Sequence, residues 1–420
     1  MNSVQLDQNT IARIDAASGQ APILVALSGG GDSVALLHLM AERLGARRLQ
    51  ACTIDHGLRA SAAADAAAAA RIAGALGVQC EIVKLAWPGG VKRSQAAARA
   101  GRYAALCETA RRVNAAVIAA AHTRDDQAET VLMRAASGSS WRGLAGIAAF
   151  APAPVWPEGR GLWLARPLLG ARRADLRAML RARGADWIED PSNENTAFAR
   201  VRLRKRLAAL GRVGFEPMRL AELAERLRPL AERLDEEALA LIARAARFEA
   251  EEAVIVPASW SGSELARRRA LSALIAAAAG ALHEPSPEAV AALEGRLGPA
   301  FRGATLGGAR LRRSGGTWRL SRDTGALHGR AGGVGPLAPL ALPQDAEIVW
   351  DGRLALTVFE PGWRAESGAE SGAPVLQRDG ERLACAEALR CGRATARWLI
   401  EDHVRHLLPV HLAVRASVAQ

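Results

Sequence analysis

The first half of the chain alternates short apolar runs with longer segments in which apolar residues recur every three or four positions. The apolar runs, each about the length of a β-strand, lie at residues 22–28, 48–55, 78–85 and 115–122. The helical patterns that follow them lie at residues 32–44, up to 76, about 94–112 and about 125–136. Strands separated by helices of ten or more residues are typical of βαβ units with right-handed crossovers. The pattern therefore predicts an α/β domain on a parallel sheet, with ligands at the carboxyl ends of the strands.

The pattern changes in the second half of the chain. Residues 172–183 are expected to form a helix, and residues 216–281 read as helical throughout, with Arg and Glu three and four positions apart. Gly and Pro concentrate at residues 325–344, which indicates a linker. Beyond it, Asp351-Gly352 between two alternating apolar runs predicts a hairpin with a type I′ turn. A helix at about 393–406 completes a small α+β module.

The chain has 420 residues, which is enough for two or three domains with cores of their own. Together with the changes of pattern, this length predicts a parallel-sheet α/β domain, an α-helical domain and a small α+β C-terminal domain. The expected boundaries are 1–213 for the first domain, 214–324 for the second, 325–344 for the linker and 345–420 for the third.

Basic residues are in excess and are unevenly distributed. The chain has 55 Lys and Arg against 43 Asp and Glu, a formal net charge of +12. Residues 160–212 hold thirteen basic and five acidic residues, and residues 302–322 hold six arginines and no acid. Two separated basic segments suit a polyanion such as RNA, because phosphate neutralisation by Arg and Lys supplies most of the sequence-independent affinity for nucleic acids. Solvated helix faces are the alternative reading of the same charges.

The five cysteines form no pair at C-x-x-C spacing, which argues against a disulfide framework, a zinc knuckle and a cluster ligand set. No window approaches the roughly 18 uncharged apolar residues that a membrane helix needs. Residues 1–19 are polar and lack the basic and apolar regions of a secretion signal. We therefore expect a cytoplasmic protein that does not cross a membrane.

The strongest chemical signal is Ser28-Gly29-Gly30-Gly31-Asp32-Ser33, directly after an expected strand and directly before an expected helix. Three glycines allow successive backbone N–H groups to surround an anion, and the helix N-terminus adds partial positive charge. The segment is neither a Walker A loop nor a G-x-G-x-x-G fingerprint. It therefore predicts a phosphate-binding loop of another kind, with a tight turn capped by Ser and Asp as the alternative.

This loop resembles the pyrophosphate loop, or PP-loop, of the N-type ATP pyrophosphatases. Further motifs narrow the resemblance to the tRNA(Ile)-lysidine synthetases and cover residues 20–207. In chain order they are Asp55-His56-Gly57-Leu58-Arg59, Ala98-Arg99 with Arg102-Tyr103, His122 before Asp125 to Thr130, Gly143-Leu144, Arg166-Pro167-Leu168-Leu169, Glu189 to Asn193, and the spaced arginines from Arg200 to Arg204.

The resemblance implies a Rossmann-like PP-loop catalytic domain at 1–213 and a tRNA-binding helical domain at 214–324. The implied reaction uses ATP and Mg²⁺ to adenylate the wobble cytidine of tRNA(Ile) with a CAU anticodon. Free L-lysine then attacks C2 of that base, which gives lysidine, AMP and pyrophosphate and changes codon reading from AUG to AUA.

The resemblance also assigns roles to residues of this chain. The implied catalytic residues are Asp32, Asp126 and Glu129, with Asp126 as an Mg²⁺ ligand. The implied ATP-binding residues are Ser28, Gly29, Gly30, Gly31, Asp32, Ser33, Asp55 and His56. The implied contacts to tRNA or substrate are Arg99, Arg102, His122, Arg166, Asp190, Asn193, Arg200 and Arg204.

The spacing of the acidic residues has a physical reading of its own. Asp125 and Glu129 are four positions apart, and Asp126 and Glu129 three, so on a helix these carboxylates share one face. Such a group holds Mg²⁺ together with phosphate oxygens, or receives an ammonium group. Helix capping accounts for one acid at an N-terminus, but less readily for three.

Two other functions remain open at this level. A tRNA thiolase of the same superfamily needs reactive or cluster-binding cysteines, and Cys52, Cys80 and Cys107 show no paired spacing. A non-catalytic RNA-binding protein accounts for the basic segments, but it leaves the phosphate loop and the acidic motif without a role. The sequence leaves the oligomeric state open, with a homodimer as one option.

Overall fold

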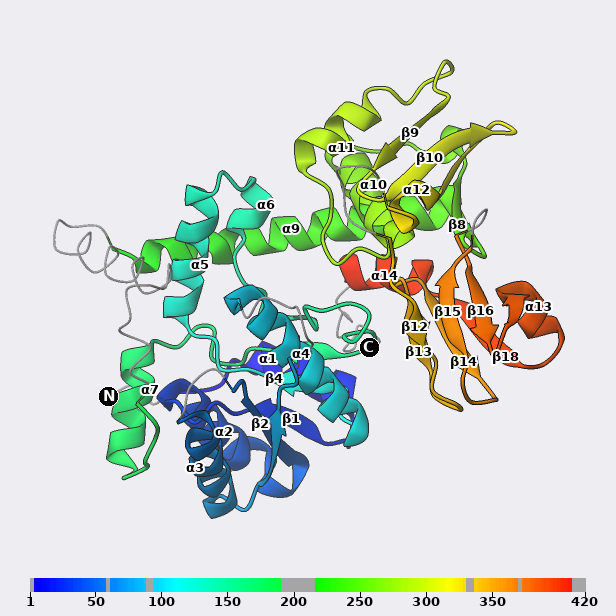
Figure 1. The fold of residues 1–420 in the computed structure, drawn as a ribbon. Helices are drawn as coiled ribbons and strands as arrows, with labels where there is room; N and C mark the ends of the chain where they lie inside the picture. The colour runs from blue at the N-terminus through cyan, green and yellow to red at the C-terminus, as the bar shows by residue number, and fades with distance from the viewer. Residues whose placement is uncertain are drawn as a thin grey trace, which may run out of the picture. The chain divides into compact units, whose positions relative to one another are not determined.

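The computed structural model in Figure 1 describes residues 4–57, 61–87, 94–189, 216–329, 336–368 and 372–409. The chain divides into two compact units, with the boundary between Glu232 and Arg233. Within the described ranges, no helix is both long enough and apolar enough to cross a bilayer.

The first unit is built on a six-stranded sheet in the order β3-β2-β1-β4-β6-β5. The strands are β1 Ile23–Ala26, β2 Leu49–Asp55, β3 Gln79–Lys84, β4 Val117–Ala119, β5 Phe150–Pro152 and β6 Trp163–Ala165. The first five strands in this spatial order pair in parallel, and β5 pairs antiparallel with β6 at one edge. The four strands expected from the apolar runs are therefore confirmed as neighbours in a parallel sheet.

Helices connect the strands, as parallel pairing requires. They are α1 Gln8–Ser18, α2 Gly31–Leu44, α3 Ala62–Ala75, α4 Gln95–Arg112, α5 Arg124–Ala136, α6 Trp141–Leu144 and α7 Arg173–Ala182, with a 3₁₀ turn, η1, at Ala46–Arg48. The helices expected after the first four strands and at 172–183 are present within one or two residues. The strand order reverses at β1, because β2 pairs on one side of it and β4 on the other.

Both faces of this sheet are covered, which explains why its strands are apolar runs. Ile23 and Val25 of β1 pack into a core with α1, α2, α3 and α7. Leu24, which points to the opposite face, packs into a second core with residues of α4 such as Leu106 and Cys107. The alternation along β1 therefore sorts neighbouring side chains into two separate cores.

The second unit departs from the α-helical module expected for residues 216–281 and from the helical domain expected for 214–324. It contains a five-stranded antiparallel sheet in the order β7-β8-β11-β10-β9. The strands are β7 Ala246–Glu249, β8 Glu252–Ile255, β9 Gly303–Leu306, β10 Ala309–Ser314 and β11 Thr317–Arg322. The helices are the part of α9 Met218–Ala245 that follows Glu232, then α10 Glu264–Ala279, α11 Pro287–Glu294 and α12 Thr324–Leu327, with a 3₁₀ turn, η3, at Pro257–Ser259.

Two Gly-Gly pairs explain the sheet that the helical expectation missed. Gly307-Gly308 joins β9 to β10, and Gly315-Gly316 joins β10 to β11. All four residues have positive φ, between 55° and 87°, and two-residue hairpin turns of type I′ need positive φ at both positions. The glycine pairs were therefore the hairpin signal in this part of the sequence.

The C-terminal part of the second unit holds two small sheets, β12-β15-β16-β17 and β13-β14-β18. The elements are β12 Leu340–Ala341, β13 Ile348–Trp350, β14 Leu354–Val358, β15 Arg364–Ser367, β16 Pro374–Arg378, β17 Glu381–Ala384, β18 Ala394–Trp398, α13 Cys385–Arg390 and α14 Ile400–Leu407. These elements make a small α+β module, but they cluster in one unit with the preceding sheet. The expected domain boundaries stay predictions, and part of the expected linker lies outside the described residues.

The hairpin expected at Asp351-Gly352 is present. Asp351 and Gly352 have φ of 49° and 65°, and the Arg353 N–H donates to the Trp350 carbonyl at 3.0 Å. The helix expected at 393–406 is wrong in its first half, because residues 394–398 form β18 and pair with β14. Only Ile400–Leu407 is helical. Side chains of β18 alternate between the core and the surface, which is a strand period.

Candidate functional site

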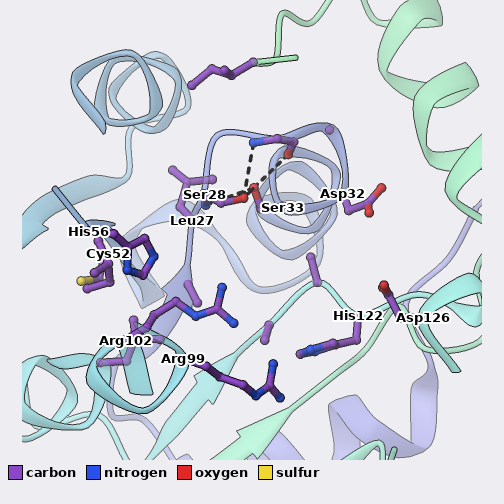
Figure 2. Close-up of a pocket in the computed structure, with 18 of the residues that line it drawn as sticks. Leu27, Ser28, Asp32, Ser33, Cys52, His56, Arg99, Arg102, His122 and Asp126 are labelled. Carbon is purple, nitrogen blue, oxygen red and sulfur yellow. Dashed lines mark hydrogen bonds between the residues drawn. The ribbon is translucent and has the colours of Figure 1, made fainter. Parts of the chain in front are cut away.

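A cavity of ≈ 400 Å³ opens at the carboxyl end of β1, where the strand order reverses. It is lined by the loop between β1 and α2, the ends of β2 and β4, and side chains of α4, α5 and α7. In Figure 2, Asp32 and Asp126 lie at one end of this cavity, while His56 and Cys52 lie at the other. The position agrees with the expectation that ligands of such sheets bind at the carboxyl ends of the strands, and the reversal of strand order is where such sheets usually open a crevice.

The loop between β1 and α2 is held by the Ser33 hydroxyl. Ser33 Oγ accepts from the Ser28 N–H at 3.2 Å, donates to the Gly30 carbonyl at 2.9 Å and lies 3.1 Å from Ser28 Oγ. The N-cap of α2 is Gly30, and no side chain caps this helix. The alternative reading of the motif, a turn capped by Ser and Asp side chains, is therefore not what the structure shows. An uncapped N-terminus of a 14-residue helix is suited to bind an anion.

Gly29 is needed in this loop for two reasons. Its φ is +80°, a conformation that costs L-residues about 1–2 kcal/mol. A Cβ at this position would also lie 2.4 Å from Cδ1 of Ile188. The Ile188 N–H donates to the Gly29 carbonyl at 2.8 Å, so the segment ending at Glu189 packs directly on the loop.

Three carboxylates from two helices surround one guanidinium beside the loop. Arg173, at the start of α7, donates from Nε to Asp32 Oδ2 at 2.9 Å and from Nη2 to Asp126 Oδ1 at 2.9 Å. Its Nη1 lies 3.7 Å from Glu129 Oε1. The predicted catalytic residues Asp32, Asp126 and Glu129 are thus brought together, through a residue that the sequence analysis did not select.

Two acids of the motif also have structural roles. Asp126 forms a capping box with Thr123, since its Oδ2 accepts from the Thr123 N–H at 2.8 Å and from the Thr123 hydroxyl at 2.9 Å. Asp125 accepts from the Arg173 N–H at 2.9 Å and so caps the start of α7. Helix capping therefore accounts for both Asp125 and Asp126, whereas the sequence pattern predicted it for only one acid of the motif.

Burial and charge act in opposite directions on this group. Burial raises the pKa of Asp32, and the neighbouring Arg173 guanidinium offsets only part of that effect. Burial by itself would lower the pKa of Arg173, but Asp126 and Asp32 raise it above its usual value. Arg173 is therefore permanently charged at physiological pH.

Another wall of the cavity is basic. Arg99 and Arg102 of α4 have their guanidinium carbons 5.1 and 5.2 Å from the centre of the Tyr103 ring. In Figure 2 both side chains extend into the cavity near His122. Burial, and after it the positive charge of Arg166, lower the pKa of His122 well below its usual value. The imidazole is therefore neutral at physiological pH, and the positive charge of this wall comes from arginine.

Most of the predicted ligand contacts line the cavity. These are Ser28, Gly30, Gly31, Asp32, Ser33, His56, Arg99, Arg102, His122 and Asp126. Their individual roles remain predictions. Asp190, Asn193, Arg200 and Arg204 lie outside the described residues.

Four predicted residues are not part of the cavity lining. Gly29 packs against Ile188, and Glu129 lies behind Arg173 with 2 % of its surface exposed. Asp55 accepts from the Gly57 N–H at 2.8 Å, which shapes its own loop. Arg166 is buried and donates to the Ala148 carbonyl at 2.7 Å, and burial lowers its pKa to about 10. Asp55 and Arg166 therefore lie outside the cavity lining in this structure, and their predicted roles stay predictions.

Arg173 had one signal in the sequence. It occupies the first position of α7, and a cation is electrostatically unfavourable at a helix N-terminus. Leu176 and Leu180 of the same helix are buried in the core, which fixes the direction of the remaining side chains. An arginine in that position requires acidic partners from elsewhere in the chain, but the sequence alone does not say which.

The second basic segment, residues 302–322, is less free to bind a polyanion than its composition indicates. Arg312 and Arg319 each pair with Glu252 at 2.7 Å. Arg322 pairs with Asp351 at 2.9 Å. Half of the six arginines in this segment therefore have acidic partners within the second unit.

The first unit and most of the chain are both similar to known proteins. Residues 4–210 match the family model of the PP-loop domain. This range includes every residue that lines the cavity described above. The first unit is therefore a PP-loop domain.

Three relatives named tRNA(Ile)-lysidine synthase extend beyond that domain. The relative from Hyphomonas neptunium is 43% identical over 296 residues, 69% of this chain and 78% of the relative. The one from Ruegeria pomeroyi is 37% identical, over 79% of this chain and 75% of the relative. The one from Methylobacterium nodulans is 41% identical, over 72% of this chain and 90% of the relative. The chain belongs to the tRNA(Ile)-lysidine synthase family, whose motifs its sequence resembles.

Proposed function

We propose that this protein uses ATP to join free L-lysine to C2 of the wobble cytidine in tRNA(Ile) with a CAU anticodon, giving lysidine, AMP and pyrophosphate. The observation that carries the proposal is the placement of Asp32 and Asp126 beside the phosphate-binding loop in one cavity. The product tRNA reads AUA instead of AUG. Its substrate also agrees with the cytoplasmic location that we expect.

The cavity suits ATP along its length. The uncapped N-terminus of α2 and the loop at Ser28–Gly30 receive the phosphates. The far end, with His56, Cys52 and Ile54, supplies an apolar wall and an imidazole for the nucleoside. Nucleotide pockets commonly combine an apolar lining with a few polar groups in this way.

The acidic end of the cavity fits Mg²⁺ that arrives with ATP. Asp32 and Asp126 offer hard carboxylate oxygens at the loop, and Mg²⁺ in such sites takes one or two carboxylates with phosphate oxygens and water as its other ligands. Among the described residues, no group of three or more His, Cys, Asp or Glu could hold a metal by itself. Bound there, Mg²⁺ would neutralise charge on the transferred and departing phosphoryl oxygens.

In the first step, the cytidine O2 attacks the α-phosphorus of ATP, the bond to the bridging oxygen breaks, and pyrophosphate leaves. N–H groups at the start of α2 stabilise the charge that develops on the phosphate oxygens. Arg99 and Arg102 add two cations on the opposite wall. The reacting base has to leave its stack to enter the cavity, which a single-stranded anticodon loop permits.

In the second step, the lysine ε-amine attacks C2 of the activated base, and the bond from C2 to oxygen breaks as AMP leaves. The amine must be neutral to attack, so one proton has to be removed from the ammonium group. Asp126 and Glu129 are the carboxylates that orient this group and accept its proton. His122 is neutral and so does not repel the incoming ammonium group.

A tRNA thiolase is the rival enzyme, and the environment of Cys52 argues against it. Cys52 is the one cysteine among the residues that line the cavity. Burial raises its pKa to about 11, so nearly all of it is the unreactive thiol at neutral pH. A sulfur carrier at this site would need a thiolate.

The test of the proposed function is incorporation of labelled lysine. Purified protein is incubated with ATP, Mg²⁺, labelled lysine and a tRNA(Ile) transcript with a CAU anticodon, while pyrophosphate release is followed in parallel. A transcript with uridine at the wobble position is the matched control, and we expect lysine in the first transcript only. Failure of the wild-type protein to incorporate lysine overturns the proposal.

Two further outcomes identify the rivals. Sulfur incorporation from an added sulfur donor, lost in Cys52→Ala, would identify a thiolase. Binding of tRNA without pyrophosphate release would identify a non-catalytic RNA-binding protein.

A further inference from the structure

Arg173 is the centre of charge in the acidic half of the cavity. Its three contacts reach Asp32 on α2 and both Asp126 and Glu129 on α5. The Arg173 side chain is 18% exposed, and that of Glu129 is 3% exposed. One guanidinium therefore neutralises carboxylates that have little water around them.

The backbone of Arg173 is held independently of its side chain. Its N–H donates to Asp125 at 2.9 Å, and the Arg124 N–H donates to the Ala171 carbonyl at 2.8 Å. These bonds tie the start of α7 to the start of α5. The guanidinium is therefore able to change partners while the start of α7 stays in place.

The carboxylates also differ in how closely they contact Arg173. Asp126 uses Oδ2 for the capping box and Oδ1 for Arg173. Glu129 lies 3.7 Å from Arg173, which is longer than a hydrogen bond. An ammonium group that enters the cavity competes with Arg173 for Asp126 Oδ1 and for Glu129, without disturbing the cap of α5.

Without Arg173, the three carboxylates would oppose the polyphosphate of ATP. Like charges a few ångströms apart in a partly buried site repel strongly, because the effective dielectric there is well below that of water. Arg173 removes one unit of negative charge next to the phosphate-binding loop. Its presence therefore favours the nucleotide, with the Mg²⁺ that arrives on its phosphates, and disfavours a free ammonium group at the same carboxylates.

We propose that Arg173 is a positioning residue that exchanges partners during the reaction. It neutralises Asp32, Asp126 and Glu129 while the nucleotide binds, and it then gives up Asp126 and Glu129 to the ε-ammonium group of the amino-acid substrate. The inference rests on the proposed function for the identity of that substrate. This exchange of partners requires that the nucleotide binds first and the amino-acid substrate second.

The test compares Arg173→Met with the matched control Arg172→Met. Arg172 precedes Arg173, is exposed and does not line the cavity, so both variants lose one positive charge at the start of α7. Affinities for labelled ATP and for labelled lysine without nucleotide are measured separately by equilibrium dialysis. We expect Arg173→Met to bind ATP roughly ten- to a hundredfold more weakly and lysine about tenfold more tightly, with wild-type affinities in Arg172→Met.

The opposite signs of the two shifts distinguish partner exchange from a structural role. Loss of both affinities, or no change in either, overturns the inference, as does lysine binding no tighter than in the wild type. Arg173→Lys is the second variant, because lysine keeps the charge but lacks the planar set of donors that bridges several carboxylates. We expect it to restore most of the ATP affinity, and failure to do so also counts against the inference.

The ATP measurement needs neither lysine nor tRNA. If the wild-type protein fails to incorporate lysine into tRNA, the proposed function is wrong, but the effect of Arg173 on ATP binding is still measured. If lysine is incorporated and the two affinities do not move in opposite directions, the proposed function stands and only the partner exchange is wrong.

Discussion

Replacement of Asp126 by Asn separates the two tasks of this side chain. In the folded protein, Asp126 Oδ2 caps α5 through Thr123, and Oδ1 pairs with Arg173 at 2.9 Å. The Asn side chain keeps one oxygen, which can still accept from the Thr123 N–H. Its amide group would then face the Arg173 guanidinium, so two donors would meet where an ion pair stands now.

The magnitudes follow from these contacts. The capping box is weakened by up to about 1 kcal/mol, because a neutral amide oxygen accepts less strongly than a carboxylate oxygen. The weakened pair with Arg173 adds about 1 kcal/mol, because Asp32 still accompanies the guanidinium. A loss of about 2 kcal/mol lowers the melting temperature of a unit of this size by about 4–8 °C. We expect tRNA-dependent pyrophosphate release to fall at least ~100-fold, which is the usual effect of removing a group that acts at the reacting atoms.

Thr123→Ala is the control, because it removes the hydroxyl from the same capping box and leaves the Asp126 carboxylate beside Arg173. We expect a loss of about 1 kcal/mol in thermal unfolding, with pyrophosphate release within about threefold of the wild type. Filter binding of labelled tRNA should be unchanged in both variants. Equal loss of pyrophosphate release in the two variants would refute the reasoning, because the effect of Asp126→Asn would then be a folding effect.

Three other predictions concern single positions. Gly29 and Gly45 have φ of +80° and +84°, so Gly29→Ala and Gly45→Ala should each cost about 1–2 kcal/mol of stability in thermal unfolding. Only Gly29→Ala should also weaken ATP binding in equilibrium dialysis, because its Cβ would lie 2.4 Å from the Ile188 side chain. Burial, and then His406, lower the pKa of His403 to about 3, so the unfolded chain binds the proton first as pH falls. Stability should therefore decline below about pH 6.5, by up to ~1.4 kcal/mol per pH unit in urea titrations, and His403→Leu should flatten that decline. Arg269→Met removes a buried guanidinium that pairs with Asp235 at 2.6 Å and Glu284 at 2.7 Å, and it should lower the free energy of unfolding by about 3–5 kcal/mol. Arg405→Met removes only an exposed ion pair and should lower it by less than about 1 kcal/mol, with both variants measured by thermal unfolding.

The parallel sheet could be predicted because its central strands, β1 and β4, are almost entirely buried and its strands alternate with helices in the sequence. The phosphate-binding loop could be predicted because glycine at Gly29 reflects a local backbone requirement. Both features are encoded over short stretches of the chain. They therefore appear in the order and spacing of neighbouring residues.

Arg173 shows what local patterns do not contain. It follows Asp126 by 47 residues and Asp32 by 141 residues in the chain, and these residues meet because α7 packs on α2 and the start of α7 is hydrogen-bonded to the start of α5. Arg312 and Arg319 likewise pair with an acid far away in sequence, since they follow Glu252 by 60 and 67 residues. The number of arginines in residues 302–322 therefore overstates how many of them are available to bind RNA.

The capping box has a consequence for redesign of the enzyme toward other amines. Asp126 belongs to the cap of α5 as well as facing the cavity, so a library that varies it would lose stability together with activity. Glu129 lies one turn further along the same helix and takes no part in that cap. Variation aimed at the length or the charge of the accepted amine is therefore best placed at Glu129, with Asp126 and Thr123 held constant.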